Sequence, residues 1–248
     1  MESRRKQVRK SAAFLHAGAA PQAPAERQPA LNRRTTGRII RILRRAAAGW
    51  NAPVMALEAA EHGDPFRTLI GCVLSLRTRD ETTAGATARL FAHAATAQAM
   101  LGLGEREIAR LIYPVGFYRN KATAILGICR DLIARFGGRV PDSIDALLTL
   151  KGVGRKTANL VVTQAYGKPG ICVDTHVHRI SNRWGLVKTL TPDDTEDALR
   201  AALPRRYWIE YNSLLVAFGQ TICQPLSPRC SRCPAGHLCP RIGVVRAR

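Results

Sequence analysis

The stretch LKGVGRKTANLVVTQAYGKPGICVDTHVHR, residues 150–179, decides the fold of this chain. Gly152 and Gly154 stand two apart between two helical patterns, so the stretch predicts a tight turn that leads from one helix into the next. The backbone N–H groups of Gly152, Val153 and Gly154 then lie at the start of a helix, where the helix dipole favours an anion such as a phosphate.

Two chemically active side chains follow that turn. Lys156 stands two residues into the second helix, and Asp174 starts a further helix after a loop that contains glycines and a proline. Each has an ordinary explanation, because a surface lysine is common and Asp174 or Thr175 is a preferred helix cap. Considered together with a cysteine cluster near the C-terminus, they indicate an amine–carboxylate pair close to a phosphate.

The charge of the chain points to a polyanionic partner. The 248 residues carry a net charge of +20, and 46% of them are hydrophobic, so a sizeable core can form beneath a basic surface. Nucleic acid is the first candidate and an acidic membrane surface is the alternative. No apolar run approaches the eighteen residues that a spanning helix needs, so the sequence predicts no membrane insertion.

The N-terminal segment has a composition of its own. Residues 1–45 hold twelve Lys and Arg against two Glu, which is half of the net charge, and an Ala/Pro/Gln tract lies among them. We expect residues 1–34 to form a disordered basic tail that binds DNA loosely. An export signal and an organelle transit peptide are the two alternative interpretations of this segment.

The remaining chain shows helical periodicity and no convincing strand pattern, so the predicted fold class is all-α. Asp64 and Pro65 predict the cap and first residue of a central apolar helix, in which Cys72 packs, and Asp80 predicts the cap of the next helix. Further helices are expected over residues 38–48, 81–91, 105–113, 121–136 and 207–221.

Four of the seven cysteines form a cluster whose spacing is Cys223-x6-Cys230-x2-Cys233-x5-Cys239. Four thiolates within seventeen residues suit a tetrahedral zinc ion or a cubane iron–sulfur cluster, and chemistry alone hardly separates the two. An odd number of cysteines with this clustering argues against a disulfide framework and for a reducing compartment.

The pattern LxGVGRKTANxVV followed by VDTHVxR resembles the endonuclease III family of the helix-hairpin-helix DNA glycosylases. The resemblance runs from about Arg38 to about Pro240, and the cysteine spacing resembles the [4Fe–4S] loop of the same family. It implies a two-lobed all-α fold with a C-terminal iron–sulfur cluster loop. One domain is then expected over residues 64–165, and the other combines residues 35–63 with residues 166–248.

The resemblance also implies residues that contact DNA. Arg77 stands where the family commonly has Gln, at the turn whose side chain enters the space left by the damaged base. Phe117 stands where the family has a wedging Leu, although a core position is the alternative for this residue. His176 matches a family histidine near DNA, with a surface or core role as its alternative. Arg229 and Arg232 lie on the cysteine loop and are expected to contact phosphates.

The implied activity is a bifunctional DNA glycosylase and abasic-site lyase that removes oxidised pyrimidines. Lys156 would attack C1′ of the sugar, and Asp174 would take its proton or stabilise positive charge on the sugar. Burial of Lys156 and nearby cations such as Arg155 are expected to help the amine lose its proton. Lys151 replaces the usual family Pro in the turn.

The expected partner is double-stranded DNA that carries damaged bases or abasic sites, bound by a monomer in a reducing, nucleoid-containing cytoplasm. The alternatives are a non-catalytic iron–sulfur DNA-binding protein, a mismatch-specific glycosylase of the same superfamily and a zinc-binding RNA-associated protein.

Overall fold

A computed structural model describes residues 31–50 and 63–248, and within these ranges it contains helices and no strand. The all-α prediction is therefore confirmed for the described residues. The predicted tail lies outside them, except that α1 already begins at Arg33 and Leu31 donates its N–H to the Trp184 carbonyl. No helix of the described part is long and apolar enough to cross a membrane.

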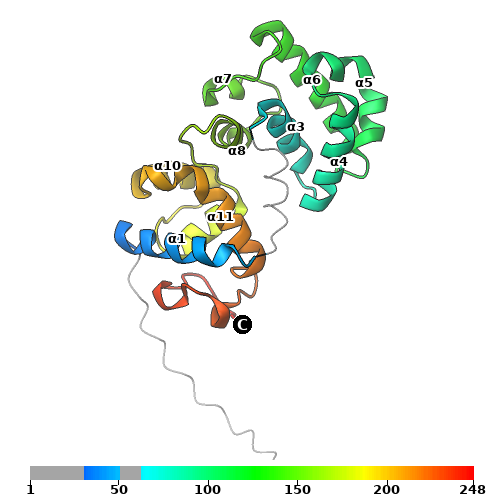
Figure 1. Cartoon of the computed structure of the whole chain (residues 1–248). Coiled ribbons are helices and arrows are strands. Elements are labelled where there is room, and N and C mark those ends of the chain that lie inside the picture. The colour runs from blue at the N-terminus through cyan, green and yellow to red at the C-terminus, as the bar shows by residue number, and fades with distance from the viewer. Residues whose placement is uncertain (1–30, 51–62) are drawn as a thin grey trace, which may run out of the picture.

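The helices form two lobes (Figure 1). The first lobe contains α3 (Pro65–Ser75), α4 (Asp80–His93), α5 (Ala97–Ile112), α6 (Tyr118–Phe136), α7 (Ile144–Leu148) and α8 (Arg155–Leu160), which continues as a π-helix over Val161–Ala165. The second contains α1 (Arg33–Ala47), α9 (Thr175–Arg183), α10 (Pro192–Ala202) and α11 (Trp208–Thr221), with short 3-10 turns at Arg205–Tyr207, Cys230–Arg232 and Gly236–Leu238.

Each lobe has its own hydrophobic core. The first core draws only on the continuous stretch from Leu69 to Val162, with α3 at its centre. The second core joins the apolar face of α1 to side chains between Ile171 and Ala235, so segments from both ends of the chain meet in it. The stretch of residues 150–179 crosses from one lobe to the other, which places its side chains at the junction.

Helix starts follow the local sequence rules. The Asp64 carboxylate accepts from the N–H groups of Phe66 and Arg67, and Pro65 is the first residue of α3, as predicted. Thr191 caps α10 in the same way. The helix expected over residues 105–113 is the second part of α5: Gly104, with a φ of +72°, interrupts the helical backbone of α5, and the helical residues that follow it end at Ile112.

The predicted hairpin joins α7 to α8. Gly152 has a φ of +91°, a left-handed value that favours glycine, and the turn closes through the bond from Val153 N–H to the Leu150 carbonyl. Gly154 precedes α8 and offers no side-chain cap, so the first N–H groups of α8 are not covered by a capping side chain.

Candidate active site between the lobes

A pocket of about 480 Å³ lies between the lobes and contains both residues of the predicted amine–carboxylate pair. Lys156 reaches it from α8, and Asp174 reaches it from the start of α9. The end of α3, the start of α4, α10 and α11 supply the remaining walls. The two side chains predicted to act together are thus brought to one cavity from opposite sides of the lobe junction.

Lys156 is exposed in the DNA-free protein. The expectation that the protein itself buries this amine is therefore wrong, and burial can come only from a molecule that fills the pocket. Its neighbour Arg155 does not supply an unpaired cation either, because its guanidinium is bonded to Glu196. Exposure leaves the Lys156 amine accessible to an incoming electrophile.

Asp174 both caps α9 and lines the pocket. Its Oδ1 accepts from the N–H groups of His176, at 2.9 Å, and Val177, at 2.8 Å, so it caps α9. The same side chain lines the pocket, which means that the capping role and a chemical role do not exclude each other. The cap fixes the carboxylate against the helix N-terminus, where negative charge is stabilised.

His176 also faces the pocket but is half-buried against α11. The ring fits there because Gly219 has no side chain: a Cβ at that position would stand 2.2 Å from His176 Nδ1. The Arg179 guanidinium lies 3.1 Å from the same nitrogen, and burial lowers the pKa of His176. A neutral ring that accepts from Arg179 is the form this environment favours.

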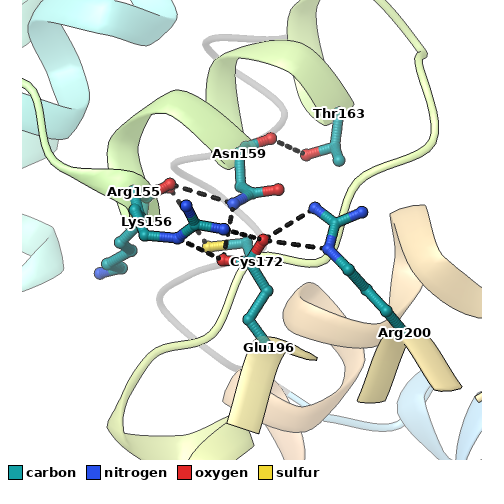
Figure 2. Close-up of polar contacts among 7 residues, drawn as sticks. All are labelled: Arg155, Lys156, Asn159, Thr163, Cys172, Glu196 and Arg200. Carbon is teal, nitrogen blue, oxygen red and sulfur yellow. Dashed lines mark hydrogen bonds and ion pairs between the residues drawn. The ribbon is translucent and has the colours of Figure 1, made fainter. Parts of the chain in front are cut away.

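A buried carboxylate connects the lobes beside Lys156 (Figure 2). Glu196 of α10 is 2% exposed and accepts from Arg155 and Asn159 of α8, while Arg200 of its own helix donates to it as well. Five N–H groups are thus directed at two oxygens, which makes this cluster the polar link that sets α8 against α10. Cys172 contributes a weaker bond from its thiol to the Lys156 carbonyl.

The two turns expected to enter DNA lie side by side at the surface of the first lobe. Arg77 and Phe117 both adopt left-handed backbone, with φ values of +54° and +56°, and each such residue costs about 1–2 kcal/mol. The Arg77 guanidinium lies 5.7 Å from the centre of the Phe117 ring. Phe117 is 61% exposed, so the alternative of a core position for it is wrong.

Other predicted residues are placed as follows. Asp80 does not cap α4: the cap position is Arg79, and the Asp80 carboxylate instead accepts from Gln220 of α11. Val153 offers DNA neither its side chain, which is buried in the first core, nor its N–H, which closes the turn. Arg232 is exposed on the cysteine loop, and Arg229 is half-buried there.

The four clustered cysteines line one cavity at the end of the second lobe, and none of the seven described cysteines forms a disulfide. Within the described ranges, no three metal-ligating side chains converge on one point as a single ion requires. The four thiols supply the donor type that metal centres with thiolate ligands use. Arg183 donates to Cys223 Sγ at 3.3 Å, a contact that suits a thiolate.

Sequence reasoning missed two charged residues that organise this region, Glu196 and Lys121. Each stands on the apolar face of its helix: Glu196 precedes Leu199 by three residues, and Lys121 precedes Ile125 by four. A charged residue in register with core positions is a usable signal, because such a residue is rarely buried without partners. The partners themselves come from distant segments and are not readable from the pattern.

Comparison with known proteins gives a consistent assignment. The family model of the HhH-GPD superfamily base excision DNA repair protein matches residues 70–205. Endonuclease III of Thermotoga maritima is 51% identical over 68% of this chain and 80% of its own length. Endonuclease III-like protein 1 of Mus musculus is 46% identical over 71% of this chain, which spans 59% of the mouse protein.

Solved structures agree. A trapped covalent intermediate of endonuclease III and DNA, an estranged-adenine complex, superposes with a TM-score of 0.75 at 34% identity, covering 84% of this chain and 96% of that one. A thermostable thymine-DNA glycosylase shares the fold, with a TM-score of 0.66 at 24% identity over 83% of this chain and 97% of its own. The hairpin, the pocket that holds Lys156 and Asp174, and these matches place the chain in the endonuclease III family of the HhH-GPD base excision DNA repair proteins.

Proposed function

We propose that the protein is a DNA glycosylase and abasic-site lyase of base excision repair that acts on oxidised pyrimidines in duplex DNA. The observation that carries the proposal is the meeting of Lys156 and Asp174 in one pocket at the lobe junction. Endonuclease III relatives and a covalent endonuclease III–DNA intermediate support it. An enzyme of this kind takes the target nucleotide out of the base stack, and a pocket of about 480 Å³ leaves room for it.

In the proposed reaction the Lys156 amine attacks C1′ of the flipped nucleotide. The C1′–N bond breaks, and the base leaves with the bonding electrons and a proton. The bound amine loses a proton, the C1′–O4′ bond breaks and O4′ takes up a proton, so that a protonated imine joins the opened sugar to Lys156. Removal of a proton from C2′ then forms a C2′–C3′ double bond and expels the 3′ phosphate. Asp174 stabilises positive charge at the sugar or accepts a proton, and the nucleotide itself supplies the desolvation that an exposed Lys156 lacks.

The decisive experiment is borohydride trapping on thymine glycol DNA. Lys156→Ala should abolish the trapped adduct and base release while duplex binding is retained, and Lys151→Ala is the matched control, an exposed lysine of the same turn. Lys121, the other nearby amine, is buried and already donates to three oxygens. If Lys156→Ala formed the trapped protein–DNA adduct at the wild-type rate, Lys156 would not be the nucleophile.

Asp174 can be tested without disturbing the helix that it caps. Asn is as good a cap as Asp, so Asp174→Asn removes the charge and leaves the geometry of α9 in place. We expect this variant to bind DNA normally and to turn over slowly. Wild-type turnover would assign Asp174 to capping alone and would favour a different proton acceptor.

We further propose that Cys223, Cys230, Cys233 and Cys239 hold a [4Fe–4S] cluster, which fixes the loop that presents Arg229 and Arg232 to phosphates. The cavity that the four thiols line and the cysteine spacing, which resembles the [4Fe–4S] loop of the endonuclease III family, support this choice. Native protein should contain about four irons per chain. Cys230→Ser should lose iron and Cys129→Ser should keep it, whereas stoichiometric zinc without iron would overturn the proposal.

The same proposal fixes the setting in which the protein acts. A thiolate-bound cluster and cysteines without disulfide bonds suit a reducing compartment, so we propose a cytoplasmic, nucleoid-associated protein that works as a monomer on DNA. A non-catalytic DNA-binding protein would bind lesion DNA without nicking it, so the nicking assay separates the two alternatives.

A further inference from the structure

Two surface turns of the first lobe behave as one unit. The first follows α3 and carries Arg77, and the second precedes α6 and carries Phe117, forty residues later in the chain. Both residues adopt left-handed backbone although neither is glycine, which is a strained conformation. Strain of this kind persists only where surrounding contacts stabilise the conformation, and contacts between the two turns do so here.

The backbones of the two turns are in direct contact. Gly116 N–H donates to Thr78 Oγ1 at 3.1 Å. A Cβ on Gly116 would stand 2.7 Å from the Arg77 carbonyl oxygen, so any larger residue must push one backbone away from the other. The absence of a side chain at Gly116 therefore permits the close approach that brings Arg77 and Phe117 together.

A buried amine completes the connection. Lys121 is 7% exposed, and its Nζ donates to the carbonyls of Leu74, at 2.8 Å, and Leu76, at 2.5 Å, and to Thr78 Oγ1, at 3.2 Å. Three N–H donors thus meet three oxygens of the Arg77 turn. Lys121 lies one helical turn after Phe117, and its own N–H donates to the Phe117 carbonyl.

The chemistry of this amine suits a fastening role. The end of α3 leaves carbonyls without helical partners, and a cation is favoured there. None of the three bonded oxygens belongs to a carboxylate, and burial lowers the pKa of Lys121 to about 8. Burying a charged amine against neutral oxygens alone costs free energy. The three hydrogen bonds also occupy the amine, so it is not accessible as a nucleophile.

We propose that Lys121 is a positioning residue that fastens the Arg77 turn to the Phe117 turn, so that both side chains enter a DNA duplex as one rigid unit and open it at the lesion. The inference rests on the proposed function, because it assigns the step that precedes attack by Lys156. Moving a paired base out of the stack requires the base pair to be broken, and both turns must stay in place while their side chains enter the duplex. A lesion without a partner base does not require this pair to be broken.

The test compares two substrates that differ only in that opening step. One is a duplex with thymine glycol opposite adenine, and the other has thymine glycol opposite an abasic spacer, so that the lesion is unpaired. Single-turnover base release is measured for wild type, for Lys121→Met, which keeps the length of the side chain without its donors, and for Lys168→Met. Lys168 is the control because its ion pair with Asp142 lies on the surface.

Lys121→Met should slow release from the paired substrate by at least about tenfold, which corresponds to about 1.4 kcal/mol, and leave release from the unpaired substrate unchanged. Gly116→Ala should act in the same direction, because it separates the turns without altering the amine. Equal losses on both substrates would show a merely structural role for Lys121 and overturn the proposal, as would no loss on either.

A second pair of variants covers the case in which Lys121→Met does not fold. Thr78→Val keeps the shape of the side chain but removes the oxygen shared by Gly116 N–H and Lys121, and Thr78→Ser restores that oxygen. We expect the valine variant to lose activity on the paired substrate and the serine variant to recover it. Equal activities of the two variants would contradict the inference.

A readout without chemistry separates this proposal from the proposed function. 2-Aminopurine placed beside a tetrahydrofuran abasic analogue brightens when the protein unstacks it, and this increase should be lost in Lys121→Met and kept in Lys168→Met. If wild type released no base from either substrate but this pattern held, the proposed activity would fail and the fastening role would stand. An unchanged increase in Lys121→Met would refute the fastening role itself.

Discussion

Replacing Glu196 with Gln should loosen the junction between the lobes by an amount that the contacts define. Oε1 accepts from Arg155, at 3.0 Å, and from Arg200, at 2.7 Å, while Oε2 accepts from Arg155 and from Asn159, at 3.1 Å. An amide keeps one acceptor, and its NH2 group would face donors at the other position. Each hydrogen bond to a charged group that is removed is worth about 1.5–3 kcal/mol.

Two features reduce the full cost. The Arg155 side chain is 43% exposed, so solvent can replace part of its pairing with the carboxylate. Asn159 Oδ1 is buried without a hydrogen-bond partner, so the Asn159 amide can flip and accept from the introduced glutamine amide at the expense of its bond to the Arg155 carbonyl. We therefore expect Glu196→Gln to lower the free energy of unfolding by about 2 kcal/mol.

Thermal unfolding followed by far-ultraviolet circular dichroism measures this change. About 2 kcal/mol corresponds to a fall in Tm of about 4–8 °C for a chain of this size. Asp142→Asn is the matched control, because it neutralises a carboxylate whose ion pair with Lys168 is exposed to solvent and contributes little to stability, so Tm should change much less. If Glu196→Gln shifted Tm no more than Asp142→Asn does, the buried carboxylate would not be the link that we describe.

Three further predictions concern other parts of the molecule. Gly219→Ala should displace the His176 ring, because the new methyl group would stand 2.2 Å from Nδ1, and should weaken lesion binding in a fluorescence anisotropy titration. Since burial lowers the pKa of Lys121 to about 8 from 10.5, the unfolded chain binds more protons between these values. The free energy of unfolding, measured by urea titration of wild type and of Lys121→Met, should therefore rise more steeply with pH in wild type over that interval. Removing residues 1–30, which include six Lys and Arg, should flatten the salt dependence of DNA binding by up to about 0.9 in logarithmic slope for each phosphate that the tail neutralises, and leave lesion preference unchanged.

The features predicted correctly from sequence are those set by neighbouring residues. The Gly152 turn and the cap at Asp64 depend on backbone rules that act within four residues, and the structure places both as expected. The pairing of Lys156 with Asp174 follows from family resemblance, and the shared pocket agrees with it. Local rules alone would leave these two residues as a surface lysine and a helix cap.

The features that escaped prediction depend on contacts between distant segments. Asp80 stands where the sequence predicts a helix cap, but its carboxylate accepts a hydrogen bond from Gln220, 140 residues away. The sequence predicts that Arg155 assists Lys156 as a free cation, but Glu196 neutralises it from across the junction. No local pattern encodes which partner a charged side chain finds once two lobes close, so these errors share one physical origin.

The composition of the two cores has a consequence for how the chain folds during synthesis. The buried side chains of the first core are all present once residue 162 has emerged from the ribosome, because they lie between Leu69 and Val162. The second core cannot close until α11 is made, since Ile39 and Leu43 of α1 pack in one cluster with Leu215 and Phe218. The first helix of the described residues is thus among the last to find its place, and its apolar face lacks its α11 partner while more than 150 further residues are added.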